Sequence, residues 1–81
     1  MIYKMSTLKK KAREAGYSLQ YGRQHYLHKG WGIVRDLAGE PIMGYQIYSY
    51  SDGVFIAGYD DIKDHSLTED EAYSLIMDLL A

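Results

Sequence analysis

The clearest pattern of hydrophobic and polar positions lies at the end of the chain. Residues 68–71 read Thr-Glu-Asp-Glu, which matches a capping box, and acidic residues suit the N-terminus of a helix. The apolar residues that follow recur at spacings of three and four, as on one face of a helix: Ala72, Leu75, Ile76, Leu79 and Leu80. The pattern therefore predicts a C-terminal helix after Thr68.

A second apolar stripe predicts a helix near the start of the chain. Its apolar positions follow a 3–4–3 spacing: Met5, Leu8, Ala12 and Ala15. Ser6 or Thr7 is expected to cap this helix, and Gly16 is expected to end it in the left-handed conformation.

The residues between the two helices have the composition of strands and turns. Ile42–Tyr50 is the strongest strand, and Ser51-Asp52-Gly53 predicts a hairpin to a returning strand at Val54–Tyr59. Weaker strands are expected before a turn at residues 37–41: Tyr17–Tyr21, Gln24–His28 (or a continuation past a bend at Gly22) and Trp31–Asp36. The order predicts one α+β domain over residues 1–81. In it, two helices cover one face of an antiparallel sheet of three or four strands.

The composition is unusual in its aromatic residues, with nine tyrosines and only one phenylalanine. Alternation along the strongest strand assigns Met43, Tyr45 and Ile47 to the core, and the residues between them to an open face. Tyrosine tolerates half-wet surfaces, and surfaces rich in aromatic residues and Arg are typical interaction sites. The candidate binding residues are Tyr26, Trp31, Arg35, Gln46, Tyr48 and Tyr50. Alternatively, the tyrosines complete a small core.

The hairpin loop decides which residues join this open face. A two-residue Asp52-Gly53 loop places Phe55, Ala57 and Tyr59 on the same face as Tyr48. A three-residue loop places Val54 and Ile56 there instead, because a shift of one residue reverses every side chain of a strand.

Charge is unevenly divided along the chain. Residues 1–36 carry eight Lys and Arg against two acidic residues, whereas residues 37–81 carry one Lys against nine acidic residues. A basic face would contact phosphates, with Tyr26, Trp31 or Tyr48 stacking on bases, through Lys9, Lys10, Lys11, Arg13, Arg23 and Lys29. An acidic surface would engage a basic partner or compete for a nucleic-acid groove, through Asp60, Asp61, Asp64, Glu69, Asp70 and Glu71. Alternatively, the two halves neutralise each other in the fold.

Several classes of function are disfavoured. The chain has no Cys, which excludes disulfides and thiolate metal sites. No apolar run approaches the roughly 18 residues of a membrane span, and the first residues lack the apolar core of a secretory signal, so we expect a cytoplasmic protein without a membrane partner. Motifs of phosphate-binding loops, serine hydrolases and zinc proteases are absent. Asp60, Asp61, Asp64 and His65 crowd one loop without matching a calcium loop, so neither a metal nor another cofactor is expected.

A short segment bears on catalysis. Gly16-Tyr17 after a helix, followed by Gly22-Arg23-Gln24-His25-Tyr26, resembles the G-[WY]…G-S-H segment of HicA-type toxins. That family cleaves messenger RNA with one His on a small domain similar to double-stranded-RNA-binding domains, so the resemblance implies that His25 is the catalytic base. The likeness is confined to residues 16–28, and Gln24 stands where the family has Ser.

A broader resemblance is to small proteins of phages and mobile elements from gut Firmicutes. It is carried by Ala15-Gly16-Tyr17, His25-Tyr26-Leu27, Gly44-Tyr45, and Gly58-Tyr59-Asp60 leading to Asp64-His65. This resemblance implies an accessory role, such as binding and blocking a host defence protein, CRISPR effectors included. We therefore expect a non-enzymatic interaction protein with a host-protein partner. The alternatives are a nucleic-acid-binding module and a HicA-like ribonuclease, and the Tyr-rich face would equally serve a homodimer.

Overall fold

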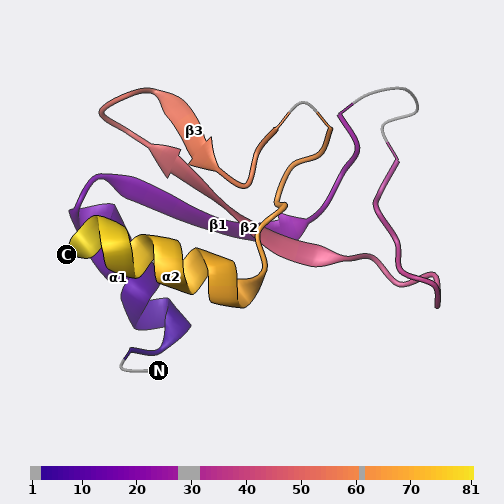
Figure 1. Ribbon diagram of the computed structural model, residues 1–81, viewed down its shortest axis with the longest axis horizontal. Coiled ribbons are helices and arrows are strands. Elements are labelled where there is room, and N and C mark those ends of the chain that lie inside the picture. Colours follow the sequence, from indigo (N-terminus) through magenta and orange to yellow (C-terminus); the bar gives the residue numbers. More distant parts are fainter. Residues whose placement is uncertain (1–2, 28–31, 61) are drawn as a thin grey trace.

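The computed structural model describes residues 3–27, 32–60 and 62–81 (Figure 1). Its elements are, in order, α1 (Met5–Glu14), β1 (Tyr17–Arg23), β2 (Met43–Ser49), β3 (Val54–Ala57) and α2 (Glu69–Leu80). The strands form one antiparallel sheet in the order β1-β2-β3, and the two helices lie together along one side of it. The predicted two-layer α+β architecture is confirmed.

The core lies between the helices and one face of the sheet. Leu19 of β1 and Ile47 of β2 are direct cross-strand neighbours, so they point to the same side. Each helix adds two buried residues from its predicted apolar stripe, which completes the core of Leu8, Ala12, Leu19, Ile47, Ala72 and Ile76. Leu75, which belongs to the same predicted stripe, is instead 37% exposed.

The capping box of α2 is confirmed. The Thr68 hydroxyl accepts a hydrogen bond from the Glu71 backbone N–H at 3.2 Å, and the Glu71 carboxylate accepts one from the Thr68 backbone N–H at 2.9 Å. The hydrogen bond that the Glu71 carboxylate accepts from the Thr68 backbone N–H lowers the pKa of Glu71, and the Thr68 side chain lowers it further. Two N–H groups that the helix itself cannot satisfy are thereby paired.

Replacing this cap has a predictable cost. Thr68→Ala is expected to reduce the free energy of unfolding by about 1 kcal/mol, because the helix loses its side-chain acceptor. Urea unfolding followed by circular dichroism measures the change. Ser74→Ala, an exposed substitution on the same helix, is the control and should not destabilise. Equal stability of the Thr68 variant and the wild type would contradict the role given to this cap.

The predicted cap of the first helix is wrong. α1 begins at Met5, so Ser6 and Thr7 lie inside it, and its N-cap Lys4 makes no side-chain capping bond. A lysine side chain carries only donors and cannot satisfy the free N–H groups at a helix start. The predicted end is confirmed, because Gly16 follows the helix with a φ of +97°.

The weaker predicted strands are only partly formed. β1 continues through Gly22 to Arg23, while the chain at 24–26 and 33–35 makes only isolated bridges. Val34 connects these segments, since its N–H donates to Gln24 and its carbonyl accepts from Ile42. The Trp31–Asp36 strand is therefore wrong in its described part, whereas 28–31 lie outside the described residues. The bridge partner of Arg35 is Pro41, which has no N–H with which to extend a ladder.

The hairpin follows the two-residue alternative at Phe55, which lies on the face of Tyr48, but departs from it at Ala57. Ser49 pairs with Val54, so the turn spans residues 50–53, an even number that keeps Phe55 on the face of Tyr48. A bulge then shifts the register, so that Ala57 lies opposite Ile47 and packs against the core. The prediction that Ala57 shares the face of Tyr48 is wrong for this reason. β3 also ends earlier than predicted, because Gly58 follows it with a φ of +80°.

Within the described residues, no helix is both long enough and apolar enough to cross a bilayer.

Candidate functional site

Four aromatic side chains form a contiguous row on the sheet face away from the helices. We call Tyr50, Tyr48, Phe55 and Tyr59 the aromatic row. Tyr48 meets Tyr50 and Phe55 edge to face, with ring centroids 5.7 and 5.0 Å apart, and Phe55 stacks on Tyr59 at 4.6 Å. Tyr50 is 57% and Tyr59 is 47% exposed, while the two central rings are half-buried. The row thus offers a fixed surface without formal charge.

The structure brings together only part of the predicted open face. Tyr48 and Tyr50 belong to the aromatic row, but Gln46 is buried at 6% exposure, so its assignment to an exposed face is wrong. Tyr26 is exposed without a ring contact to the described aromatics. Arg35 donates from its guanidinium to the Gly39 carbonyl at 2.8 Å, and Trp31 lies outside the described residues.

Gln46 is buried because the chain at 58–60 and 62–67 folds back over the other end of this face. Gly22 and Gly44 are direct neighbours across β1 and β2. A Cβ atom on Gly22 would lie 2.9 Å from Nε2 of His65, and one on Gly44 would lie against the His65 carbonyl oxygen. The bare backbone of these two glycines is therefore the floor on which His65 rests. Tyr45 and Leu67 hold the segment there through a pair of backbone hydrogen bonds.

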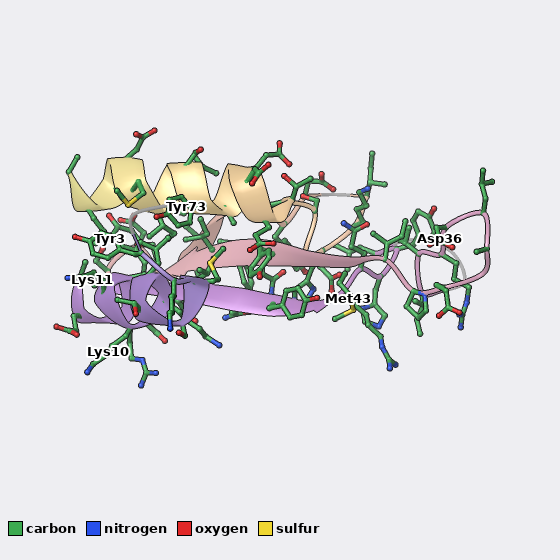
Figure 2. All side chains as sticks on the ribbon, turned by 90° about the horizontal axis from the view of Figure 1, so that it is seen from below. Tyr3, Lys10, Lys11, Asp36, Met43 and Tyr73 are labelled. Carbon is green, nitrogen blue, oxygen red and sulfur yellow. The ribbon has the colours of Figure 1, made fainter. Side chains whose placement is uncertain are left out.

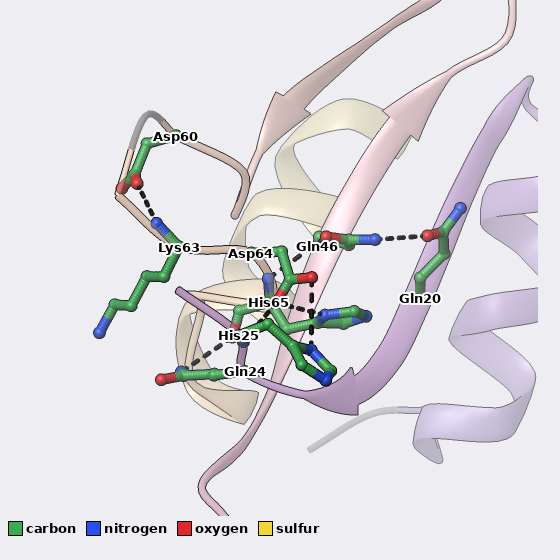
Figure 3. A network of polar contacts seen from close by, with 8 residues as sticks. All are labelled: Gln20, Gln24, His25, Gln46, Asp60, Lys63, Asp64 and His65. Carbon is green, nitrogen blue, oxygen red and sulfur yellow. Dashed lines mark hydrogen bonds and ion pairs between the residues drawn. The ribbon is translucent and has the colours of Figure 1, made fainter. Parts of the chain in front are cut away.

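Side-chain amide groups of β1 and β2 and of Gln24 hold this segment in place (Figure 3). Gln46 donates to the Gln20 side chain at 2.6 Å and accepts from the His65 backbone N–H at 3.2 Å. Gln24 donates to the His65 carbonyl at 2.8 Å. His65 has a φ of +45°, so its backbone strain is balanced by these contacts.

Asp64 joins this segment to residues 24–26. Its Oδ1 accepts from the His25 backbone N–H at 2.8 Å, and its own N–H donates to the His25 carbonyl at 3.1 Å. The carboxylate also lies between two imidazoles, 3.6 Å from Nδ1 of His25 and 3.1 Å from Nδ1 of His65. The second approach is close enough for an ion pair but is not aligned as a hydrogen bond. Burial alone would raise the pKa of Asp64, yet the His65 side chain, the His25 backbone N–H and the charges of both imidazoles lower it.

The chemistry available to His25, Asp64 and His65 is limited by how far each side chain is exposed to solvent. The side chain of His25 is 41% exposed, whereas those of Asp64 and His65 are 17% and 16% exposed. Across the described ranges, no three side chains of His, Asp or Glu are arranged to hold a metal ion. Asp60 uses its carboxylate in its own turn, where it accepts from the backbone N–H groups of Ile62 and Lys63 at 2.8 and 2.9 Å.

The predicted basic residues are spread over different sides of the molecule. Lys9 and Arg13 line a pocket beside the start of β1. Lys11 lies 5.1 Å from the centre of the Tyr3 ring, and Lys10 points away from α2 (Figure 2). Arg23 lies at the far end of β1, and Lys29 is outside the described residues.

The predicted acidic surface is reduced to Asp60 and the start of α2. Glu69, Asp70 and Glu71 are exposed there, whereas Asp64 is turned inward, and Asp61 lies outside the described residues. Among the residues that the structure describes, the ion pairs join only His25 and His65 to Asp64. Among these residues, salt bridges between Lys or Arg of the first half and Asp or Glu of the second half are therefore not observed.

Sequence reasoning placed Phe55 and Tyr59 on the face of Tyr48 in only one of its two hairpin alternatives, and it missed the glycine floor. The alternation of side chains along β3 places Phe55 on the face of Tyr48 once the loop is known to contain an even number of residues. Tyr59 comes after Gly58, the glycine that ends β3. No local pattern relates Gly22 and Gly44 to a histidine that follows much later in the chain.

Comparison of the chain with protein-family models, curated proteins and solved structures finds no match, so the aromatic row and the pockets are the basis on which a function is argued.

Proposed function

We propose that this chain is a small non-enzymatic interaction protein that binds a protein partner through the aromatic row. The observation that carries the proposal is the chain of ring contacts from Tyr50 to Tyr59 on the helix-free face, with both end rings about half exposed. Tyrosine is enriched at the desolvated centres of protein interfaces, where charged residues are depleted. Rings that already contact one another lose little conformational freedom on binding.

The surroundings of the row favour a protein over a nucleic-acid strand as its occupant. Lys9 and Arg13 lie beside the Tyr50 end of the row alone. Arg23 lies at the end of β1 away from Tyr50, and the other end of the row lies beside the exposed Asp60. A strand stacked along all four rings would need phosphate contacts along the whole row, which these charges do not supply. The resemblance to phage and mobile-element proteins supports a host protein as the partner and blockage of that protein as the outcome. The lack of Cys supports a cytoplasmic setting.

A ribonuclease that uses His25 is the competing function. Asp64 lies 3.6 Å from Nδ1 of His25, which would orient a partly exposed imidazole. General acid–base cleavage also needs a second group that can exchange a proton, and the side chain of the neighbouring His65 is only 16% exposed. We therefore expect no RNA cleavage by the purified protein. Cleavage that disappears in a folded His25→Ala variant would replace the binding proposal.

The binding proposal is tested by capture at two salt concentrations. Tagged protein is incubated with nuclease-treated bacterial lysate and washed at low and at high salt. We expect a stoichiometric band that survives both washes with the wild type and is lost with Tyr48→Ala/Tyr59→Ala. Interface hot spots each contribute at least about 2 kcal/mol, so the double variant should lose roughly 1,000-fold in affinity.

Tyr26→Ala is the matched control. Tyr26 is 44% exposed, close to the 47% of Tyr59, but it lies outside the aromatic row. The control should retain the band, and thermal melting shows whether each variant is folded. Equal retention by the double variant and the wild type would contradict the proposal. So would a wild type that captures no protein and elutes on a sizing column as a dimer that Tyr48→Ala/Tyr59→Ala dissociates.

A further inference from the structure

A small pocket lies at the corner of the sheet where α1 leads into β1. It has a volume of about 230 Å³ and is lined by Lys9, Arg13, Tyr17, Ser18, Leu19 and Tyr50. Lys9 and Arg13 are four residues apart on α1, so they project from the same side of the helix. Two cations and three hydroxyl-bearing side chains therefore surround one space.

The walls of this pocket are fixed by the backbone. Tyr17 pairs with Ser49 in the sheet, and the N–H of Tyr50 donates to the Gly16 carbonyl at 3.0 Å. Gly16 has a positive φ, which directs the chain from the helix into β1. The end of α1, the start of β1 and the end of β2 are thus held together, and Tyr50 keeps its place opposite the helix.

The charge inside the pocket is uncompensated. No acidic residue lines it, and within 3–27, 32–60 and 62–81 neither Lys9 nor Arg13 forms an ion pair. The nearest acidic residues along the chain lie outside the pocket. Glu14 lines the groove between α1 and the end of α2, and Asp52 accepts from the Ser49 hydroxyl at 3.2 Å. Such a site favours an anion, and Arg together with hydroxyl groups is a typical phosphate environment.

The volume of the pocket limits the size of the anionic group, and the tyrosine at its rim indicates what else the ligand carries. Drug-sized ligands fill about 300–1,000 Å³, so this pocket accommodates a phosphate group but not a whole nucleotide. Tyr50 forms part of its wall, is 57% exposed, and meets Tyr48 at the beginning of the aromatic row. A planar group attached to the phosphate would lie on this ring, and aromatic rings stack on any nucleobase.

We propose that the corner pocket binds the phosphate of a nucleotide through Lys9 and Arg13, with the base stacked on Tyr50. Free mononucleotides and the ends of single strands share this chemistry. The inference does not depend on a protein partner, because it uses only the Tyr50 end of the aromatic row.

Binding is tested by isothermal titration with five probes: AMP, adenosine, inorganic phosphate, a phosphoserine peptide and a single-stranded oligonucleotide of four deoxyadenosines. We expect AMP to bind more tightly than adenosine or phosphate, because only AMP occupies both the pocket and the ring. Arg13→Gln should weaken the binding of AMP at least tenfold. Tyr50→Ala should reduce the affinity for AMP to the affinity for inorganic phosphate. If the oligonucleotide binds more tightly than AMP, the natural ligand is the end of a single strand. If the two affinities are similar, the natural ligand is a free nucleotide.

Lys10→Gln is the control, because it removes the same charge from α1 at a residue outside the pocket. Unchanged AMP affinity in Lys10→Gln with loss in Arg13→Gln supports the site. An equal loss in both variants would show general attraction to a basic helix and overturn it, as would tighter binding of a phosphoserine peptide than of AMP. Tyr48→Ala/Tyr59→Ala should leave AMP binding intact, so failure here and failure of the protein-binding proposal are distinguishable.

Discussion

A protein carrying Gly44→Ala is expected to lose much of its stability. The added methyl group would overlap the His65 carbonyl oxygen and lie 3.0 Å from both the Gln24 amide nitrogen and the Leu67 carbonyl oxygen. Leu67 cannot retreat, because its carbonyl accepts from the Tyr45 N–H at 2.9 Å. Overpacking costs about 1–3 kcal/mol and occasionally more, and we expect the upper end here.

This cost is large for a domain of 81 residues. At about 4–8 °C for each kcal/mol, a loss of about 3 kcal/mol lowers the melting temperature by at least about 12 °C. Thermal unfolding followed by circular dichroism measures the change. Gly32→Ala is the matched control, because nothing lies within 4 Å of its added methyl group and the change should stay within about 0.5 kcal/mol. Similar melting of the two variants would show that the chain at 58–60 and 62–67 does not rest on β2.

Such a contact could not be predicted from the sequence, whereas the helices could. The stripe on α2 and its capping box depend on residues within one or two turns of each other, and the core accordingly contains Ala72 and Ile76. The cap of α1 was mispredicted because Ser and Thr also occur inside helices, where packing of Leu8 and Ala12 decides the boundary.

The faces of the sheet were predictable only where no other segment covers them. Alternation correctly assigned Ile47 to the core and Tyr48 to the other face. It failed at Gln46, which is covered by a segment about 20 residues further along the chain. It failed again at Ala57, because one bulge residue reverses the faces and no sequence signal marks the bulge.

The two candidate sites also differ in how far the sequence predicts them. Part of the aromatic row was predicted, because Tyr48 and Phe55 follow from strand pairing alone. The corner pocket was not, because it requires the end of β2 to return beside the start of β1, where Tyr50 meets Lys9 and Arg13. Of the six cations assigned to phosphate binding, the fold thus places two around one pocket. A nucleotide there and a protein on the rest of the row would be neighbours, so each would affect the binding of the other through Tyr50.

Asp64→Asn is expected to destabilise the protein at neutral pH and much less in acid. The variant loses the charge that faces His25 and His65, and hydrogen bonds to charged groups contribute about 1.5–3 kcal/mol. In the folded protein the pKa of Asp64 lies below its ordinary value of 3.8. Its stabilisation is therefore complete well above pH 3.8, where the carboxylate is ionised in both states, and disappears as the pH falls through the lower, folded value.

Urea unfolding of the wild type and the variant at pH 7, 5 and 3 measures this difference. We expect a large gap at pH 7, a gap at least as large at pH 5, where imidazoles carry more positive charge, and a smaller gap at pH 3, where the unfolded wild type has already taken up the proton. Asp78→Asn, an exposed change in the last turn of α2, is the control and should show a small gap at every pH, since a negative charge there does not favour the helix dipole. A gap that stays constant from pH 7 to pH 3 would mean that the second acceptor oxygen of Asp64, which Asn replaces with an NH2 donor, and not the charge, holds the chain at 58–60 and 62–67 on the sheet. Because the same segment begins beside Tyr59, losing this charge should also loosen the end of the aromatic row and weaken capture of the partner in parallel with stability.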